Sequence, residues 1–232
     1  MDEARKTSLI FGLFFAGTFA FSVPALPFYA SILHDADYIL GGGLDTHVSI
    51  GALLEILLAI CNIATAVVIF PLVRRVKETV ALGYVAVRIV ESVIILTGVI
   101  SLMSVLTLRA GFAPGGDADT LKLAGQLLVA FHDWTFLLGP QFCAGIGSGL
   151  LLGYLMYRSG LVPPRMALLG LIGGPLAFLG GVLVLFDVLE PMSPGLFALT
   201  ALEIAWELSV TVYAIVKGFR PISIIQQAPI PA

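Results

Sequence analysis

Long runs of apolar residues alternate with short polar segments along the whole chain. A helix needs about 20 mostly apolar residues to cross the hydrocarbon core of a bilayer. Six runs reach that length and therefore predict six transmembrane helices, at residues 8–33, 48–73, 79–108, 121–157, 166–186 and 196–216. We expect an all-α, polytopic membrane protein, a six-transmembrane-helix bundle in which residues 1–232 form a single integral membrane domain.

The fourth run, residues 121–157, is too long for a single straight crossing of a core about 30 Å thick. Splitting it at Gly139 and Pro140 gives seven crossings, whereas treating it as one kinked helix gives six. With six crossings, nearly all lysines and arginines fall on one side of the membrane. Arg109 and Lys122 alone fall on the other side, and Arg88 lies within the membrane. The remaining lysines and arginines share the near side: Arg5, Lys6, Arg74, Arg75, Lys77, Arg158, Arg165, Lys217 and Arg220. Basic residues concentrate on the cytoplasmic side, so we predict both termini in the cytoplasm and an over-long fourth helix kinked at Pro140.

Composition narrows the class of protein. The chain is 59% hydrophobic and 12% charged, about half the charged fraction of a soluble domain. It has no basic patch for nucleic acid, and no phosphate-binding loop, dinucleotide fingerprint, serine nucleophile motif or heme motif. Its two cysteines, Cys61 and Cys143, lie in apolar runs without a neighbouring cysteine, so no disulfide framework is readable. We therefore expect the lipid bilayer as the main partner and predict no cofactor.

Five charged residues lie deep inside the apolar runs, away from their ends: Glu55, Arg88, Glu91, Glu203 and Glu207. A charge in the hydrocarbon core costs about 3 kcal/mol or more, so such residues face a partner or a wet cavity. The helical rise places Glu55, Glu91 and Glu203 roughly 10 Å below the outer surface, with the other two near the midplane. Residues three or four apart share a helix face, so the pairs 88/91 and 203/207 form two stripes that can meet across the bundle.

Four glutamates against one arginine leave three carboxylates unbalanced if all are ionised. Burial and mutual repulsion both disfavour the ionised carboxyl, so protons, a bound cation or a cationic ligand must balance them. The alternative is that Arg88 is a structural pin, ion-paired to Glu91 and Glu207, in a cavity that merely holds water.

Three further polar residues, Gln126, His132 and Asp133, lie at the outer end of the fourth run and form the predicted rim of the pocket. His132 and Asp133 have the chemistry for a proton relay, or for binding a metal together with His34 and His47. Adjacent residues on a helix point about 100° apart, which does not suit joint ligation of one ion. We therefore predict no metal site.

Several stretches together carry a resemblance over nearly the whole chain. They are RIVE at 88–91, GYLMYRSGLVP at 153–163, the His132–Asp133 pair before Leu137, Leu138 and Gly139, and the glutamate of the last run. The chain resembles the bacterial membrane proteins grouped as the domain of unknown function 4386 family. The resemblance implies six transmembrane helices in a bacterial inner membrane, and it implies no activity.

The leading functional hypothesis is a membrane protein whose carboxylate and arginine pocket binds a small molecule, an ion or protons, for transport or sensing. In this hypothesis Arg88 anchors an anionic group or positions Glu91, while Glu203 and Glu207 titrate. A structural or assembly protein with internal charge pins is the first alternative. An intramembrane hydrolase is the second, although the sequence lacks the multiple histidines typical of such enzymes. Ligand identity and oligomeric state are not readable from the sequence.

Overall fold

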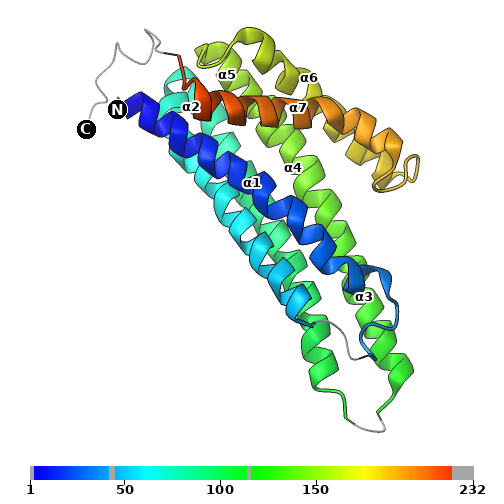
Figure 1. Ribbon diagram of the computed structural model, residues 1–232. Helices are drawn as coiled ribbons and strands as arrows, with labels where there is room; N and C mark the ends of the chain where they lie inside the picture. The colour runs from blue at the N-terminus through cyan, green and yellow to red at the C-terminus, as the bar shows by residue number, and fades with distance from the viewer. Residues whose placement is uncertain (1–2, 42–44, 114–115, 221–232) are drawn as a thin grey trace.

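The computed structural model describes residues 3–41, 45–113 and 116–220 (Figure 1). Within these ranges the regular elements are all helical. Five continuous helical stretches are long and apolar enough to cross a membrane: α1 (Glu3–His34), α2 (Asp45–Ala110), the stretch Ala118–Ser159, α6 (Pro164–Leu185) and α7 (Pro194–Val216). The prediction of an all-α protein is confirmed, and the helices indicate a membrane protein with several candidate spans.

Helix α2 differs from the sequence prediction, because the expected second and third helices are joined without a loop. Its backbone leaves helical geometry at Lys77, where φ is −161° and ψ is 103°. Figure 1 shows the helix turning back on itself there. Three pairs of residues bring the two arms together in antiparallel order: Ala59 with Ser92, Asn62 with Arg88, and Thr65 with Tyr84. The described chain thus has five continuous long helices where the sequence predicts six, because a single extended residue is enough to reverse the helix.

The fourth predicted segment runs continuously from Ala118 to Ser159. It comprises α3 (Ala118–Phe136), η1 (Leu137–Gln141), α4 (Phe142–Ala144), η2 (Gly145–Leu152) and α5 (Gly153–Ser159), of which η1 and η2 are wider π-helical turns. Pro140 lies inside η1. Proline has no backbone N–H and clashes with the preceding turn, and local π turns relieve such conflicts in membrane helices. The structure therefore shows altered helical geometry at Pro140, while a kink there stays a prediction.

The first and last helices meet at one end of the molecule. Arg5 donates from Nη1 to the carbonyl of Ala214 at 2.9 Å and from Nη2 to that of Ile215 at 2.6 Å. The Ser8 hydroxyl donates to Ala214 and accepts from the backbone N–H of Phe219. These bonds satisfy carbonyl groups that the end of α7 leaves without helical partners.

From that end, α1 and the α6–α7 hairpin diverge (Figure 1). A large apolar core that includes Phe11, Tyr84 and Trp206 fills the end where α1 and α7 meet. A second core, which includes Tyr29 and Leu102, joins α1, α2 and α3 at the other end.

Parts of the predicted loops lie outside the described residues. These are residues 42–44 of the glycine-rich loop, residues 114–115 of the next loop, and the predicted polar tail from residue 221 onward.

Candidate functional site

Arg88 is the centre of the buried polar network. It lies on the second arm of α2 and its surface is 2% exposed. Its Nη1 donates to Glu91 Oε2 at 2.8 Å and to Ser148 Oγ at 3.2 Å, and its Nη2 donates to Asn62 Oδ1 at 2.6 Å. The guanidinium carbon also lies 5.6 Å from the centre of the Phe15 ring. The Arg88–Glu91 pair predicted from the i,i+3 spacing is present, and Arg88 links both arms of α2 to η2.

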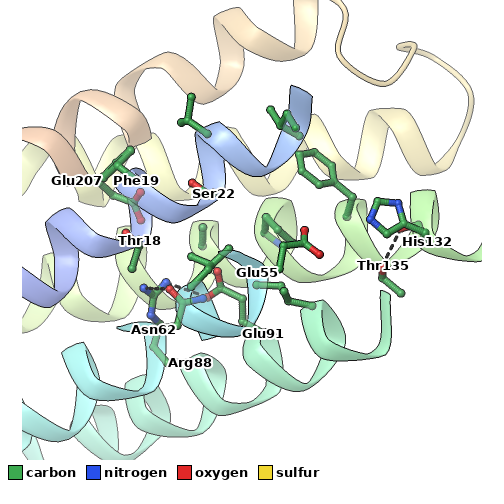
Figure 2. A pocket seen from close by; sticks show the side chains of 17 residues that line it. Thr18, Phe19, Ser22, Glu55, Asn62, Arg88, Glu91, His132, Thr135 and Glu207 are labelled. Carbon is green, nitrogen blue, oxygen red and sulfur yellow. Dashed lines mark hydrogen bonds and ion pairs between the residues drawn. The ribbon is translucent and has the colours of Figure 1, made fainter. Parts of the chain in front are cut away.

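A cavity of about 270 Å³ opens beside this network. Its lining comes from α1, both arms of α2, α3, η1, α4 and α7. The polar residues of the lining are Thr18, Ser22, Glu55, Asn62, Arg88, Glu91, His132, Thr135 and Glu207. Figure 2 shows Arg88, Asn62 and Glu91 grouped together, His132 and Thr135 farther along, and Glu55 between the two groups. The tertiary structure therefore brings four of the five predicted intramembrane charges, and His132, to one cavity.

Glu55 belongs to a second small cluster at the wall of this cavity. The Tyr29 hydroxyl donates to Glu55 Oε2 at 3.0 Å. The Tyr29 ring meets the His132 ring edge-on, with 5.7 Å between the ring centres. His132 is buried, and its Nδ1 lies 3.7 Å from Asp133 Oδ1, too long for a hydrogen bond. Tyr29 thus holds Glu55 and contacts His132, which places two titratable side chains on the same wall.

Glu203 and Glu207 have different environments although they lie one helical turn apart. Glu207 lines the cavity, whereas Glu203 does not. Glu203 is 2% exposed, and neither of its carboxyl oxygens has a hydrogen-bond partner among the described residues. No ion pair joins either glutamate to Arg88 in the described part of the chain, so the predicted Arg88–Glu207 ion pair is not formed.

The predicted rim residues divide between two cavities. His132 lines the main cavity, while Gln126 and Asp133 line a second cavity of about 230 Å³ next to the loop after α1. Adjacent positions on α3 point in different directions, so His132 and Asp133 face different spaces. The sequence predicted Gln126 and Asp133 at the rim of the main cavity. That prediction is wrong for these two residues, which line the second cavity instead.

The second cavity is bordered by a polar cluster at the surface end of the helices. Tyr38 lines it, and the Tyr38 hydroxyl donates to Asp45 Oδ1 at 3.1 Å. Arg109 Nη1 donates to the same oxygen at 2.7 Å and its guanidinium carbon lies 5.1 Å from the centre of the Tyr38 ring. Burial, followed by the hydrogen bond to Asp45, raises the pKa of Tyr38. This cluster ties the loop after α1 to both ends of α2.

Sequence reasoning missed two residues that organise the site. Tyr29 is one of several hydroxyl-bearing residues in an apolar helix, and Ser148 lies in a glycine-rich run that predicts helix packing. Neither has a local sequence pattern that indicates a role, because both act on residues far away in the chain.

Among the described residues, no group of three or more His, Cys, Asp or Glu side chains has an arrangement that could hold a metal ion.

The comparisons with known proteins give one match. The family model described as Domain of unknown function (DUF4386) matches residues 10–218, most of the chain. No curated protein and no solved structure matches this chain.

Proposed function

Since the chain belongs to the family described as Domain of unknown function (DUF4386), kinship assigns no activity, and we propose from the site itself that the protein binds a small organic cation within the membrane. Binding of this kind serves either transport across the membrane or sensing.

The charge of the main cavity carries the proposal. Three carboxyl groups and one guanidinium line it. The guanidinium of Arg88 is already paired with Glu91 at 2.8 Å. Within the described ranges, no basic side chain lies within ion-pair distance of Glu55 or Glu207. A cationic ligand would offset one of these two negative charges, whereas an anionic ligand would add a third negative charge in a medium of low dielectric constant.

The rest of the lining suits an apolar body attached to the charged group. Val23, Leu26, Leu58, Ile95 and Phe136 lie on the cavity wall. A volume of about 270 Å³ is near the lower end of small-molecule sites, and a cavity of about 150 Å³ already accommodates benzene. A single-ring amine such as benzylammonium therefore matches the cavity in size, apolar surface and charge.

The membrane placement that accompanies this proposal has six crossings, with each arm of α2 spanning the bilayer once. The reversal at Lys77 then lies on the same side as the start of α1 and the end of α7. Basic residues of the turns favour the cytoplasm for that side, in the inner membrane of a bacterium. The depth of Glu55 and Glu91 then places the cavity in the outer half of the bilayer.

Ligand binding is tested with purified protein in lipid nanodiscs, using benzylammonium, benzyl alcohol and benzoate as matched probes. We expect benzylammonium to raise the melting temperature in a saturable way, because only this probe supplies the positive charge. Replacing Glu207 by Gln removes one counter-charge, so it should weaken binding at least tenfold, which corresponds to about 1.4 kcal/mol. Glu190→Gln, which changes an exposed glutamate outside the cavity, should bind as the wild type does.

Stabilisation by benzyl alcohol or benzoate equal to that by benzylammonium would contradict a cation site. An absence of effect from all three probes would also contradict it.

The structural alternative is favoured by one observation, the hydrogen bonding of Arg88 to three side chains. Removing one partner of a buried ion pair is strongly destabilising, whereas replacing all partners by apolar residues is often neutral. A pin with no ligand role therefore predicts that Arg88→Met unfolds the protein and that adding Glu91→Leu and Asn62→Leu restores stability. The same triple variant retains Glu55 and Glu207, so it should still bind benzylammonium if the cavity is a cation site.

A further inference from the structure

Glu203 lies in a tight interface between three helical segments rather than in the cavity. Its carboxyl group packs on Gly149 of η2, where a methyl group would lie 2.5 Å from Glu203 Oε2. Its backbone packs on Gly173 of α6, where a methyl group would lie 2.6 Å from the Glu203 nitrogen. The absence of side chains at these two glycines makes the space that the glutamate occupies.

The position of Glu203 in this interface is held by its neighbour Trp206. The Trp206 side chain is fully buried against Gly170, and its indole N–H donates to the carbonyl of Ser148 at 2.8 Å. This bond joins α7 to η2 within one turn of the glutamate. Since α7 is fastened on this side, the Glu203 carboxyl does not reach solvent by a small rotation of the helix.

Few charged groups face Glu203. On α7 it faces Glu207, and on α2 it faces Arg88 and Glu91, which are already paired with each other. The packed faces of η2 and α6 present no titratable group, since η2 has none and the one ionisable residue of α6, Arg165, lies in its first turn. Among the described residues, no hydrogen-bond donor reaches the Glu203 carboxyl, and the cation that it faces, Arg88, is already paired with Glu91.

An ionised carboxylate without hydrogen bonds or a counter-ion is very costly in an apolar interior, and such a group neutralises instead. We propose that Glu203 is a proton-binding site, occupied at neutral pH, which exchanges its proton with the main cavity through Glu207. The second glutamate is the natural route because it lies one turn away on the same helix face and lines the cavity.

The other intramembrane glutamates do not share this environment. Glu91 accepts from Arg88, and Glu55 accepts from Tyr29. Glu203 differs from both in having no hydrogen-bond partner in the described part of the chain, and its proton site is distinct from the proposed cation site. The proposal does not depend on whether an amine binds in the cavity.

The test is infrared spectroscopy of the ligand-free protein in lipid nanodiscs at neutral pH. A protonated carboxylic acid gives a carbonyl stretch that ionised carboxylates lack, and deuteration shifts it. We expect this band in the wild type and in Glu190→Gln, and its loss in Glu203→Gln. In Glu207→Gln the band should remain, while its shift after transfer to heavy water should be several-fold slower than in the wild type.

A wild-type spectrum without the band, or a band that persists unchanged in Glu203→Gln, would overturn the proton site. Wild-type exchange kinetics in Glu207→Gln would overturn the route through that residue. Gln and Met are neutral replacements of similar length, so both Glu203→Gln and Glu203→Met should fold. Unfolding of both variants would show that the charged form is required and would also overturn the proposal.

Discussion

Arg88 and Glu203 are both buried charged residues, yet the fold compensates only one of them. Arg88 has three hydrogen-bonding side chains and an aromatic ring around it. Glu203 has two carboxyl oxygens without hydrogen-bond partners among the residues that the structure describes, and glycines pack against it. The two buried ionisable residues thus differ in chemistry. The compensated guanidinium of Arg88 stays charged, whereas the uncompensated carboxyl of Glu203 takes up a proton.

A substitution at Gly149 tests the tight interface around Glu203. A methyl group there would meet both the Glu203 carboxyl and the backbone of Gly174. Because backbone cannot move aside cheaply, we expect Gly149→Ala to lower the free energy of unfolding by about 1–3 kcal/mol. Thermal or denaturant unfolding in detergent measures the change.

The matched control is Gly83→Ala on α2, where the added methyl group has ordinary contact with Leu151 at 3.5 Å. This variant should be as stable as the wild type or more stable, since alanine favours a helix by up to about 1 kcal/mol over glycine. Equal stability of the two variants would contradict close packing at Gly149.

At the scale of single helices, side chains that bond the unpaired backbone groups fix where a helix begins and ends. Helix α3 begins after Asp117, whose carboxylate accepts from the backbone N–H groups of Asp119 and Thr120 and from the Thr120 hydroxyl. Arg5 caps the other kind of helix end, since it donates to the last carbonyl groups of α7. The first interaction is local and follows the usual preference for aspartate at an N-cap, whereas the second depends on two helices at opposite ends of the chain.

The Asp117 cap predicts a pH dependence in the first turn of α3. The hydrogen bonds from Thr120 lower the pKa of Asp117 from its ordinary value. A depressed pKa in the folded state means that the cap stabilises the turn above the ordinary carboxyl pKa, and that this stabilisation is lost as pH falls through the folded value. Amide hydrogen exchange at Asp119 and Thr120, corrected for intrinsic rates, should therefore lose protection on acidification.

Asp117→Ala should show weak protection of these two amides at every pH, whereas Glu190→Ala should behave as the wild type does. If protection in the wild type is independent of pH, or survives in Asp117→Ala, the carboxylate is not the cap.

At the scale of the whole molecule, the end that joins α1 to α7 also contains the reversal of α2 at Lys77 (Figure 1). The proposed cavity depends on this arrangement, since it is lined by both arms of α2 together with α1, α7 and the stretch Ala118–Ser159. Five segments must therefore assemble before the candidate site exists.

Six crossings predict the side on which each turn is exposed. Single cysteines in place of Asp119 and Glu190 should react with a membrane-impermeant maleimide in intact cells. Cysteines in place of Glu78 and Lys217 should react only after permeabilisation, because six crossings place them on the inner side. All four positions are exposed in the structure, so each cysteine is accessible to the reagent from its own side. Reaction of the Glu78 and Asp119 positions from the same side would contradict a separate crossing by each arm of α2.

Much of the fold was readable from the sequence, and the reason is physical. Apolar runs of sufficient length must form helices in lipid, because every backbone polar group needs a partner there. The positions of the long helices and the burial of Arg88 and Glu91 follow from this rule. The polar residues 74–78 marked where the chain reverses, but not that a single extended residue, Lys77, would reverse the helix without a loop.

The candidate site was only partly readable. Spacing alone paired Arg88 with Glu91, since residues three apart share a helix face. Glu203 and Glu207 also share a helix face, but spacing did not predict their different surroundings, because the glycines of η2 and α6 admit one glutamate to a closed interface and leave the other at the cavity. The sequence by itself determined which charges are placed in the apolar helices. The tertiary structure decided which of them have partners, because the partners come from helices that meet only in the folded bundle.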